Sequence, residues 1–543
     1  MSPWRRWHFL LVIVALWAPT YLLGLGASEI KSEEAKRIMP AQTMLASHDW
    51  RAWVLPSVGG EAYYKKPPGI NWLIAGSFRL CGSQEEWAAR LPSALLVGLL
   101  AGLMAGLPCP FLNPRAQFLA ALIFLGSVGI LENGRLIEID GPYTAFAGLA
   151  LVWWLYRYAA RPRGWDTWIV PALFLAAGAL LKGPFLAAAV YPVILLTLLS
   201  RRRLWDLLCP AHLAGIALIL VLCLGWVLLA RHQTNVDAMT GTWSDQIGSR
   251  VLPWHIQWGS WVLQIGRALV LMLPFVLLAP LLWVDFFVRR LPAAQMPYFR
   301  ALRWGSAAGF VLLGMMPGAM ARYALPVLPG VALALAAVLE MHRQPIASDR
   351  WWRLAVQVGF SAGAVVAVFS LIVLECVNPA GVFVAILALA AVALVAAWPS
   401  MLTGGQALTV ATGVLMAVLA MELTIYSRPF RARGETRRPA GAAITRRVGA
   451  DQVLDVYHPG YAPFLYYVRC PMRIIAPGGT IDLQVRSILL AGRDRDQPAM
   501  LERLKAQDFH VTYKISLQEG TWQLLQRQPE SLDMIHPSLP NQE

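Results

Sequence analysis

Apolar segments long enough to cross a lipid bilayer recur through most of this chain. An α-helix needs about 20 residues to span a hydrocarbon core of roughly 30 Å. The chain is 57% hydrophobic and only 14% charged, whereas an ordinary soluble domain is roughly a quarter charged. We therefore predict an α-helical polytopic membrane protein with about 13 transmembrane helices. The predicted spans are 8–25, 87–107, 116–132, 142–158, 167–182, 185–200, 211–230, 261–285, 304–320, 323–341, 354–374, 380–398 and 405–426.

Arginines between these segments predict the orientation of the chain. Arg5 and Arg6 precede the first apolar segment, and no small-residue cleavage pattern follows it, so we expect this segment to stay as an anchor. Lys and Arg favour the cytoplasmic side of short loops. Alternation from an inside N-terminus then places the arginines of further loops on that side: 157–163, 201–203, 289–290 and 343–353. The segments predicted to face outward are 27–86, 132–141, 231–260 and the tail from about 427.

Membrane orientation also explains the net charge of +15, because the basic residues gather in the inside loops and the tail. Nucleic acid is therefore not an expected partner. The six cysteines are scattered, with no CxxC pair and no histidine at ligand spacing. This spacing predicts neither a zinc site nor an iron–sulfur site.

The first outer loop, 27–86, is too polar to span a bilayer and too apolar to lie free in water. Its apolar and tryptophan residues suit an amphipathic helix in the interface, running from Ile38 to Trp53. A second apolar stretch follows Pro68 and has only about half the length of a span, which predicts an interfacial or re-entrant helix. We expect these outward-facing helices to roof a cavity that opens to lipid and to water.

The chain changes character after the last predicted span, which gives two predicted domains, 1–426 and 427–543. The tail begins with a basic, Pro- and Gly-containing stretch that suits a juxtamembrane linker beside anionic headgroups. Alternating strand-like and helix-like runs follow it, so we predict a small extracytoplasmic α/β domain. No glycine-rich phosphate loop or catalytic triad is present there, and we assign the domain no chemistry.

Carboxylates stand at the outer ends of the predicted spans. Glu29, Glu33 and Glu34 follow the first span, and Asp140 leads into the helix predicted at 142–158. Acidic residues near a membrane surface are ordinarily only a solvated face. A carboxylate at a helix N-terminus is also stabilised by free N–H groups and the helix dipole. Their common predicted depth nevertheless makes them candidates for a general base.

Basic and aromatic residues are expected at the same face. Lys66 precedes Pro67, and Lys182 ends one span directly before Gly183 and Pro184. A boundary lysine either snorkels to the headgroups or pairs with a functional group, and a lysine is suited to bind phosphate as a point charge. A guanidinium binds phosphate oxygens in bidentate fashion, whereas an interfacial tyrosine is usually only a belt residue. The further candidates in this group are Arg322, Tyr323, Arg135, Tyr63 and Tyr64.

The order of these motifs resembles a known superfamily. An acidic pair is followed by MLASHDW, KPP at 66–68, ARLPS at 89–93, Asp140, KGP at 182–184, and RYALP at 322–326. This order resembles the protein-O-mannosyltransferase-like membrane glycosyltransferases, and among them the bacterial aminoarabinose transferases that modify lipid A. The resemblance covers the membrane part to about residue 340.

The resemblance implies a polyprenyl-phosphate sugar donor and catalysis at the outer face of the bacterial cytoplasmic (inner) membrane. By position, the family's acidic pair falls on Glu33 and Glu34, its second aspartate on Asp140, and its phosphate-binding lysines on Lys66 and Lys182. Many members have Asp where this chain has Glu33, so Glu29 or Glu34 are alternatives for part of the role. The aminoarabinose transferases tend to have an acidic residue where this chain has Lys65, which argues against a metal site at that position.

The predicted reaction is an inverting displacement at the anomeric carbon of the sugar. Glu33 or Glu34, with Asp140 as a further candidate, would be the general base. Lys66, Lys182, Arg322 and Tyr323 would hold the donor phosphate and stabilise the leaving group. The acceptor is a lipid, a glycan or a protein. We assign no metal ligand and no cofactor. A bound divalent metal is the alternative.

Two other classes of function remain open from the sequence. A transporter or flippase for a lipid-linked or anionic substrate would use the same basic cavity, but it should show internal repeats and helices broken at the bilayer midplane. We find no convincing repeat, and the ionisable residues gather at the outer boundary. A structural membrane protein with an outer sensor domain would leave the polar motifs without a role.

Overall fold

The computed structural model describes residues 4–30, 32–234, 236–251, 258–289, 291–316, 318–341, 435–475, 479–481, 485–491, 497–517 and 520–527. Contacts divide the chain into two compact units. The first comprises Met1–Pro56 and Tyr63–Arg433, and the second comprises Ser57–Ala62 and Gly434–Glu543. The predicted domain boundary at 426/427 lies outside the described residues.

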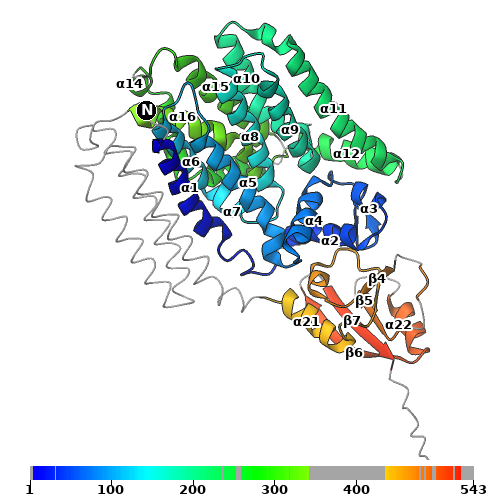
Figure 1. Cartoon of the computed structure of the whole chain (residues 1–543). Coiled ribbons are helices and arrows are strands. Elements are labelled where there is room, and N and C mark those ends of the chain that lie inside the picture. The colour runs from blue at the N-terminus through cyan, green and yellow to red at the C-terminus, as the bar shows by residue number, and fades with distance from the viewer. Residues whose placement is uncertain are drawn as a thin grey trace, which may run out of the picture. The chain divides into compact units, whose positions relative to one another are not determined.

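The first unit is helical, and its central element is α8 (Asp140–Tyr158) (Figure 1). Almost every side chain of α8 is buried, including Trp154, Tyr156 and Tyr158. Helices from both before and after it in the sequence pack against it: α5 (Glu86–Gly106), α9 (Trp165–Lys182), α10 (Ala187–Ser200) and α16 (Leu328–Met341). The remaining helices of the bundle are α1 (Trp4–Leu22), α6 (Pro114–Leu125), α7 (Val128–Asn133), α11 (Pro210–Arg231), α12 (Val236–Val251), α13 (Trp258–Leu271), α14 (Asp285–Val288) and α15 (Met296–Gly314).

Glycines allow these helices to approach closely, as is typical of helix packing in membranes. A Cβ atom added at Gly148 of α8 would lie 2.3 Å from Leu100 Cδ2 and 2.8 Å from Pro329 Cγ. One added at Gly305 of α15 would lie 2.7 Å from the backbone of Val193 in α10. The interhelical contacts therefore depend on small residues at particular positions.

Four helices among the described residues are long and apolar enough to cross a membrane by length and composition. They are Glu86–Gly106, Trp165–Lys182, Pro210–Arg231 and Ala321–Glu340, and they match the predicted spans 87–107, 167–182, 211–230 and 323–341. Shorter apolar helices, Arg6–Leu22, Pro114–Leu125 and Pro184–Ser200, lie where three further spans are predicted. The predicted spans 354–374, 380–398 and 405–426 lie outside the described residues.

Some predicted spans are not continuous helices. The segment predicted at 261–285 consists of α13 and the 3₁₀ helix η4 (Phe275–Leu282), which meet at 95°. Pro274 stands between them, and a proline cannot donate the backbone hydrogen bond that would continue the helix. The segment predicted at 116–132 is divided into α6 and α7 at Gly126 and Ser127.

The first outer loop contains the short helices that the sequence predicts, with shifted boundaries. Helix α2 (Ser32–Ala46) buries Ile38, Ala41 and Met44 completely. It ends before the tryptophans, so the prediction of one helix reaching Trp53 is wrong: a separate turn of helix, α3 (Arg51–Val54), follows it. Helix α4 (Gly69–Cys81) is short, as expected. The strands β1 (Ser57–Val58) and β2 (Glu61–Ala62) form a hairpin that we did not predict.

The second unit contains a five-stranded mixed sheet in the order β4–β3–β5–β7–β6. Its strands are β3 (Leu454–Tyr457), β4 (Met472–Ile475), β5 (Ser487–Ala491), β6 (Phe509–Leu517) and β7 (Gly520–Arg527). Each overlaps a strand-like run of the sequence, and β6 and β7 extend beyond theirs. Strand β3 pairs in parallel with both β4 and β5, whereas β5–β7 and β7–β6 are antiparallel. Helix α22 (Gln497–Lys505) contributes Leu504 to a core with Ile488, Leu490, Phe509 and Leu525. An α/β domain is therefore present after the membrane part.

The basic stretch after the last predicted span is partly folded, which corrects its assignment as a linker. Residues Arg437–Val448 form helix α21, which packs on the 3₁₀ helix η8 (Pro463–Tyr467). Gly441 permits this packing, because a Cβ atom there would lie 2.4 Å from Tyr467 Cβ. The buried face of Ala440, Ala443 and Ile444 thus outweighs the polar character of the sequence.

Candidate active site

The centre of the candidate site is an ion pair between the ends of two packed helices. Asp140 lies in the first turn of α8 and Lys182 is the last residue of α9. The Lys182 ammonium donates a hydrogen bond to Asp140 Oδ1. Gly183 has φ +103°, a conformation that favours glycine and ends the helix directly after Lys182. The Tyr143 hydroxyl fixes this break by donating to the Gly183 carbonyl at 2.9 Å.

Arg322 adds a second cation to the same carboxylate. It belongs to the 3₁₀ helix η5 (Ala321–Val327), which packs on α8. Its Nε lies 3.0 Å from Asp140 Oδ2, and its terminal nitrogen donates to Glu138 Oε2 at 2.9 Å. The Asp140 carboxylate is almost fully buried between Lys182 and Arg322. The structure thus brings together Asp140, Lys182 and Arg322, which the sequence placed at one depth.

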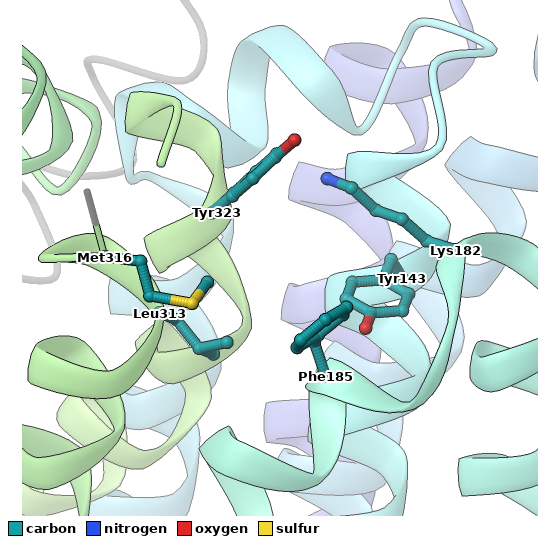
Figure 2. A pocket seen from close by; sticks show the side chains of 6 residues that line it. All are labelled: Tyr143, Lys182, Phe185, Leu313, Met316 and Tyr323. Atoms are coloured by element: carbon teal, nitrogen blue, oxygen red, sulfur yellow. The ribbon is translucent and has the colours of Figure 1, made fainter. Parts of the chain in front are cut away.

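A pocket opens beside this ion cluster. It is lined by Tyr143, Lys182, Phe185, Leu313, Met316 and Tyr323. The side chains of Lys182 and Tyr323 point toward each other across the polar end, and Leu313, Met316 and Phe185 form an apolar end (Figure 2). Lys182 Nζ lies 3.9 Å from the centroid of the Tyr323 ring, within the range of a cation–π interaction. A cation beside apolar lining residues suits a ligand with an anionic head and a hydrocarbon tail.

Glu33 lies on α2 with 43% of its side chain exposed. It pairs with Lys36 Nζ at 2.6 Å and lies 3.8 Å from a terminal nitrogen of Arg37. Partial burial raises the pKa of this carboxyl, but Lys36, Arg37 and Arg322 together hold the pKa below its usual value. The influence of Arg322 places Glu33 within electrostatic reach of the Asp140 cluster. Glu33 is therefore an accessible carboxylate that stays ionised.

Glu34 has a different environment, although it is the next residue. Its side chain is 0% exposed, and Arg90 of α5 donates to both of its oxygens at 2.8 Å. The backbone N–H of Ile137 donates to it as well, at 3.1 Å. Arg90 also donates to the carbonyls of Leu25, Ser28 and Glu29. Glu34 therefore joins the segment after α1 to the turn before α8.

Two of the further candidates make contacts near the end of α1. Arg135 is buried and donates to the carbonyls of Thr20 and Leu23 at the end of α1. The carbonyl of Glu29 accepts from Arg90. Both residues thus contribute to the junction between α1 and the turn before α8.

The segment before α4 carries the remaining candidates. The Tyr63 hydroxyl accepts from Arg37, the residue that also approaches Glu33. The Tyr64 carbonyl accepts from Trp243 Nε1 of α12 at 2.9 Å. Half-buried Lys66 stands directly before Pro67, at the start of α4. Hydrogen bonds therefore attach Tyr63 to α2 and Tyr64 to α12.

Sequence reasoning missed several residues that shape the site. Arg90 lies inside the ARLPS motif, so its position was noted without its role as partner of Glu34. Glu138 lies in the turn before α8, and its sequence position gave no sign that it pairs with Arg322. Tyr143, Arg37 and Trp243 gave no signal, because one aromatic or basic residue on an apolar helix or loop is common. Among the described residues, no group of three His, Cys, Asp or Glu side chains is placed to hold a metal ion.

Part of the chain is similar to a known protein family. Residues 65–228 match the family described as dolichyl-phosphate-mannose-protein mannosyltransferase. This range contains Lys66, Asp140 and Lys182. The chain resembles the protein-O-mannosyltransferase-like membrane glycosyltransferases.

A second similarity is to a curated arabinosyl transferase. The undecaprenyl phosphate-alpha-4-amino-4-deoxy-L-arabinose arabinosyl transferase of Pseudomonas savastanoi pv. phaseolicola is 31% identical over 231 residues. The match covers 42% of this chain and 42% of that relative. This match confirms the predicted resemblance to aminoarabinose transferases.

Solved structures show that the likeness extends over the whole fold. The crystal structure of ArnT from Cupriavidus metallidurans bound to undecaprenyl phosphate matches with a TM-score of 0.69 at 17% identity, covering 97% of this chain and 98% of that one. The apo state of the same protein matches with a TM-score of 0.68 at 17% identity, covering 96% of this chain and 98% of that one. The chain therefore shares the fold of this ArnT, and a sheet domain follows its helical part.

Proposed function

We propose that this protein transfers a sugar from a polyprenyl-phosphate donor to a lipid, glycan or protein acceptor. One observation carries the proposal: the buried Asp140 carboxylate lies between Lys182 and Arg322, beside a pocket whose far end is apolar. Cations can bind the phosphate of such a donor, and the apolar passage can take the first part of its hydrocarbon chain. The undecaprenyl phosphate bound to the ArnT relative and the donor in the name of the Pseudomonas relative support the same ligand class.

In the proposed complex the donor phosphate lies between the basic residues of the site. Lys182, Arg322 and Lys66 supply positive charge, and Tyr323 supplies a hydroxyl at the polar end of the pocket. These groups neutralise the charge that builds on the leaving phosphate as the bond to the anomeric carbon breaks. Since the lipid phosphate is itself the leaving group, no nucleotide is required.

The acceptor oxygen attacks the anomeric carbon from the opposite face, with inversion of configuration. A new carbon–oxygen bond forms, the bond to phosphate breaks, and a carboxylate accepts the acceptor's proton. We assign this proton transfer to Glu33 or Asp140. Glu33 is exposed enough to meet an acceptor, and its pKa is held below the usual value. Glu34 is better suited to a structural role, because it is fully buried and accepts hydrogen bonds from Arg90 and from the backbone of Ile137.

We further propose the arrangement of the chain in the bacterial inner membrane. The membrane part, 1–426, would cross about 13 times and carry the site at its outer face. The domain at 427–543 would be extracytoplasmic. The arginine-rich loops support this orientation, because Lys and Arg favour the cytoplasmic side.

Transfer is tested with purified protein in lipid nanodiscs. The protein is incubated with undecaprenyl-phosphate sugars and envelope lipids or glycans, and products are identified by mass spectrometry. Sugar-modified acceptor and free undecaprenyl phosphate are expected with the wild type and absent with Asp140→Asn. The transporter alternative predicts movement of intact donor between leaflets of proteoliposomes without sugar transfer, and that result would overturn the proposal.

A further inference from the structure

The β1–β2 hairpin of the first outer loop clusters with the C-terminal domain. Its strands pair Ser57 with Ala62 and Val58 with Glu61 around Gly59 and Gly60. These glycines have φ values of +62° and +86°, which tight hairpin turns require and which side chains disfavour. The hairpin belongs to the compact unit formed with residues 434–543, although helices of the other unit precede and follow it in the chain.

Close backbone contacts explain why the hairpin belongs to this unit. A Cβ atom at Gly59 would lie 1.9 Å from the carbonyl oxygen of Gly460, so no side chain fits there. A Cβ atom at Gly60 would lie 3.2 Å from Ile474 Cγ2 of β4. Glu61 Oε1 also lies 4.0 Å from His458 Nε2. The turn thus contacts both the loop after β3 and the edge strand of the sheet.

The loop that receives the hairpin lies at a topological switch point. Strands β3 and β5 are adjacent and parallel, and β3 continues to β4 on one side whereas β5 continues through α22 to β6 on the other. Open α/β sheets bind their ligands at the carboxyl ends of strands where the connections diverge in this way. In this domain the position is taken by Gly59 of the same chain, against the loop of His458 and Gly460.

Chain connectivity links this contact to the donor site. Tyr63 N–H donates to the Pro56 carbonyl at 2.7 Å and closes the base of the hairpin. Lys66 follows Ala62 by only a few residues, and each extended residue spans at most about 3.6 Å. Pro67 and Pro68 then fix the backbone before α4. The hairpin and Lys66 are therefore joined by a short segment, through which a shift of the hairpin can act on Lys66.

We propose that the C-terminal domain is a positioning module for donor binding: it binds the β1–β2 hairpin at its switch point and thereby sets the position of Lys66. The inference rests on the proposed function, in which Lys66 binds the donor phosphate. Gly59 is then a positioning residue, because it acts through Lys66 and not on the donor itself.

The test uses full-length protein and a matched pair of glycine variants. Gly59→Ala introduces a side chain that collides with Gly460, whereas Gly82→Ala has nearly the same φ, +61°, with no atom within 4 Å of the new Cβ. Gly59→Ala should raise the Kd for undecaprenyl phosphate and the donor KM about tenfold, corresponding to about 1.4 kcal/mol, with kcat at saturating donor nearly unchanged. Gly82→Ala should bind the donor as the wild type does.

A double-mutant cycle shows whether the effect passes through Lys66. If it does, Gly59→Ala should weaken binding much less in a Lys66→Ala background than in the wild type, because coupled residues are not additive. Full additivity, or wild-type affinity of Gly59→Ala, would overturn the inference. Ile474→Ala is a milder variant on a half-exposed strand and should weaken donor binding in the same direction.

Hydrogen exchange separates failure of this inference from failure of the proposed function. Backbone amides from Tyr63 to Lys66 should exchange faster in Gly59→Ala than in Gly82→Ala, with or without donor. Equal exchange in the two variants would contradict the positioning role. Wild-type protein that binds no undecaprenyl phosphate would instead contradict the proposed function, while the exchange comparison would still decide whether the hairpin orders this segment.

Discussion

At the scale of single residues, the charged groups around each carboxylate indicate its role in the candidate site. Asp140 and Lys182 form a buried pair beside the pocket, whereas Glu33 lies on a half-exposed helical face. Glu34 is fully buried against Arg90. Substitutions at these positions should therefore separate binding, catalysis and stability.

Lysine substitutions should affect donor binding. Lys182→Ala and Lys66→Ala should each weaken the affinity for undecaprenyl phosphate about 10- to 100-fold, since a hydrogen bond to a charged group contributes about 1.5–3 kcal/mol. Lys505→Ala in α22 is the control, because Lys505 pairs with an exposed glutamate on the same helix. Affinity is measured by titration of protein in nanodiscs. Unchanged affinity in both variants would mean that these lysines only snorkel.

Carboxylate substitutions should distinguish the base from the structural residue. Glu33→Gln or Asp140→Asn should lower kcat by about 100- to 10,000-fold if that residue accepts the proton, and Glu29→Gln is the comparison. Glu34→Gln should instead lower the free energy of unfolding by about 3–5 kcal/mol, because it removes one partner of a buried Arg–Glu ion pair. Kinetics and thermal unfolding of the same preparations provide both measurements. Wild-type rates in all of these variants would exclude the carboxylate mechanism.

The pH profile should depend on the charges around Glu33. If Glu33 is the base, it is active as the carboxylate, so activity falls as the pH drops through its pKa. Since Lys36, Arg37 and Arg322 hold this pKa below its usual value, the acid limb should lie below the ordinary range for glutamate. Lys36→Met removes the hydrogen-bonding cation and should move the limb to higher pH. An acid limb that does not move in Lys36→Met would argue for a different base.

At the scale of elements, the site depends on where helices begin and end. The start of α8 and the end of α9 meet because the two helices pack against each other, and the break at Gly183 directs the chain away after Lys182. The turn before α8 approaches the helix closely: a Cβ atom at Gly141 would lie 2.3 Å from the Asn133 carbonyl oxygen.

Gly141→Ala should therefore displace the turn that carries Glu138 and Asp140. The collision is with backbone, which cannot rotate away, so we expect a loss of about 1–3 kcal/mol in stability together with reduced turnover. Gly76→Ala in α4 is the matched control, because no atom lies within 4 Å of its new Cβ. Since alanine is the better helix former, Gly76→Ala should be neutral or slightly stabilising. Equal stability of the two variants, measured by thermal unfolding, would contradict the close packing.

At the scale of the whole molecule, the proposal depends on which side of the membrane each part faces. A cysteine added after Glu543 should react with an impermeant maleimide in intact cells, and one at Arg202 should react only after lysis. The native cysteines are first replaced by serine, so that only the new residue is labelled. An inside location for the residue after Glu543 would contradict the outward orientation of the C-terminal domain.

The sequence by itself determined the class of the protein and the order of its motifs. Repeated apolar segments require helices in a membrane whatever their packing, and short motifs such as KPP and KGP indicated a superfamily before any contact was known. The strands of the C-terminal domain were also predictable, because their apolar runs are bounded by turn residues. Each of these signals lies within a short stretch of the chain, so it can be recognised from the sequence alone.

Only the tertiary structure decided which charges meet. Glu33 and Glu34 are adjacent residues of the same type, yet Glu34 is buried and paired with Arg90, far along the chain, whereas Glu33 is half-exposed and paired with Lys36. The contact of Gly59 with Gly460 likewise joins positions far apart in the sequence. Such pairings depend on how helices and strands pack, and no pattern of period 2 or 3.6 encodes them.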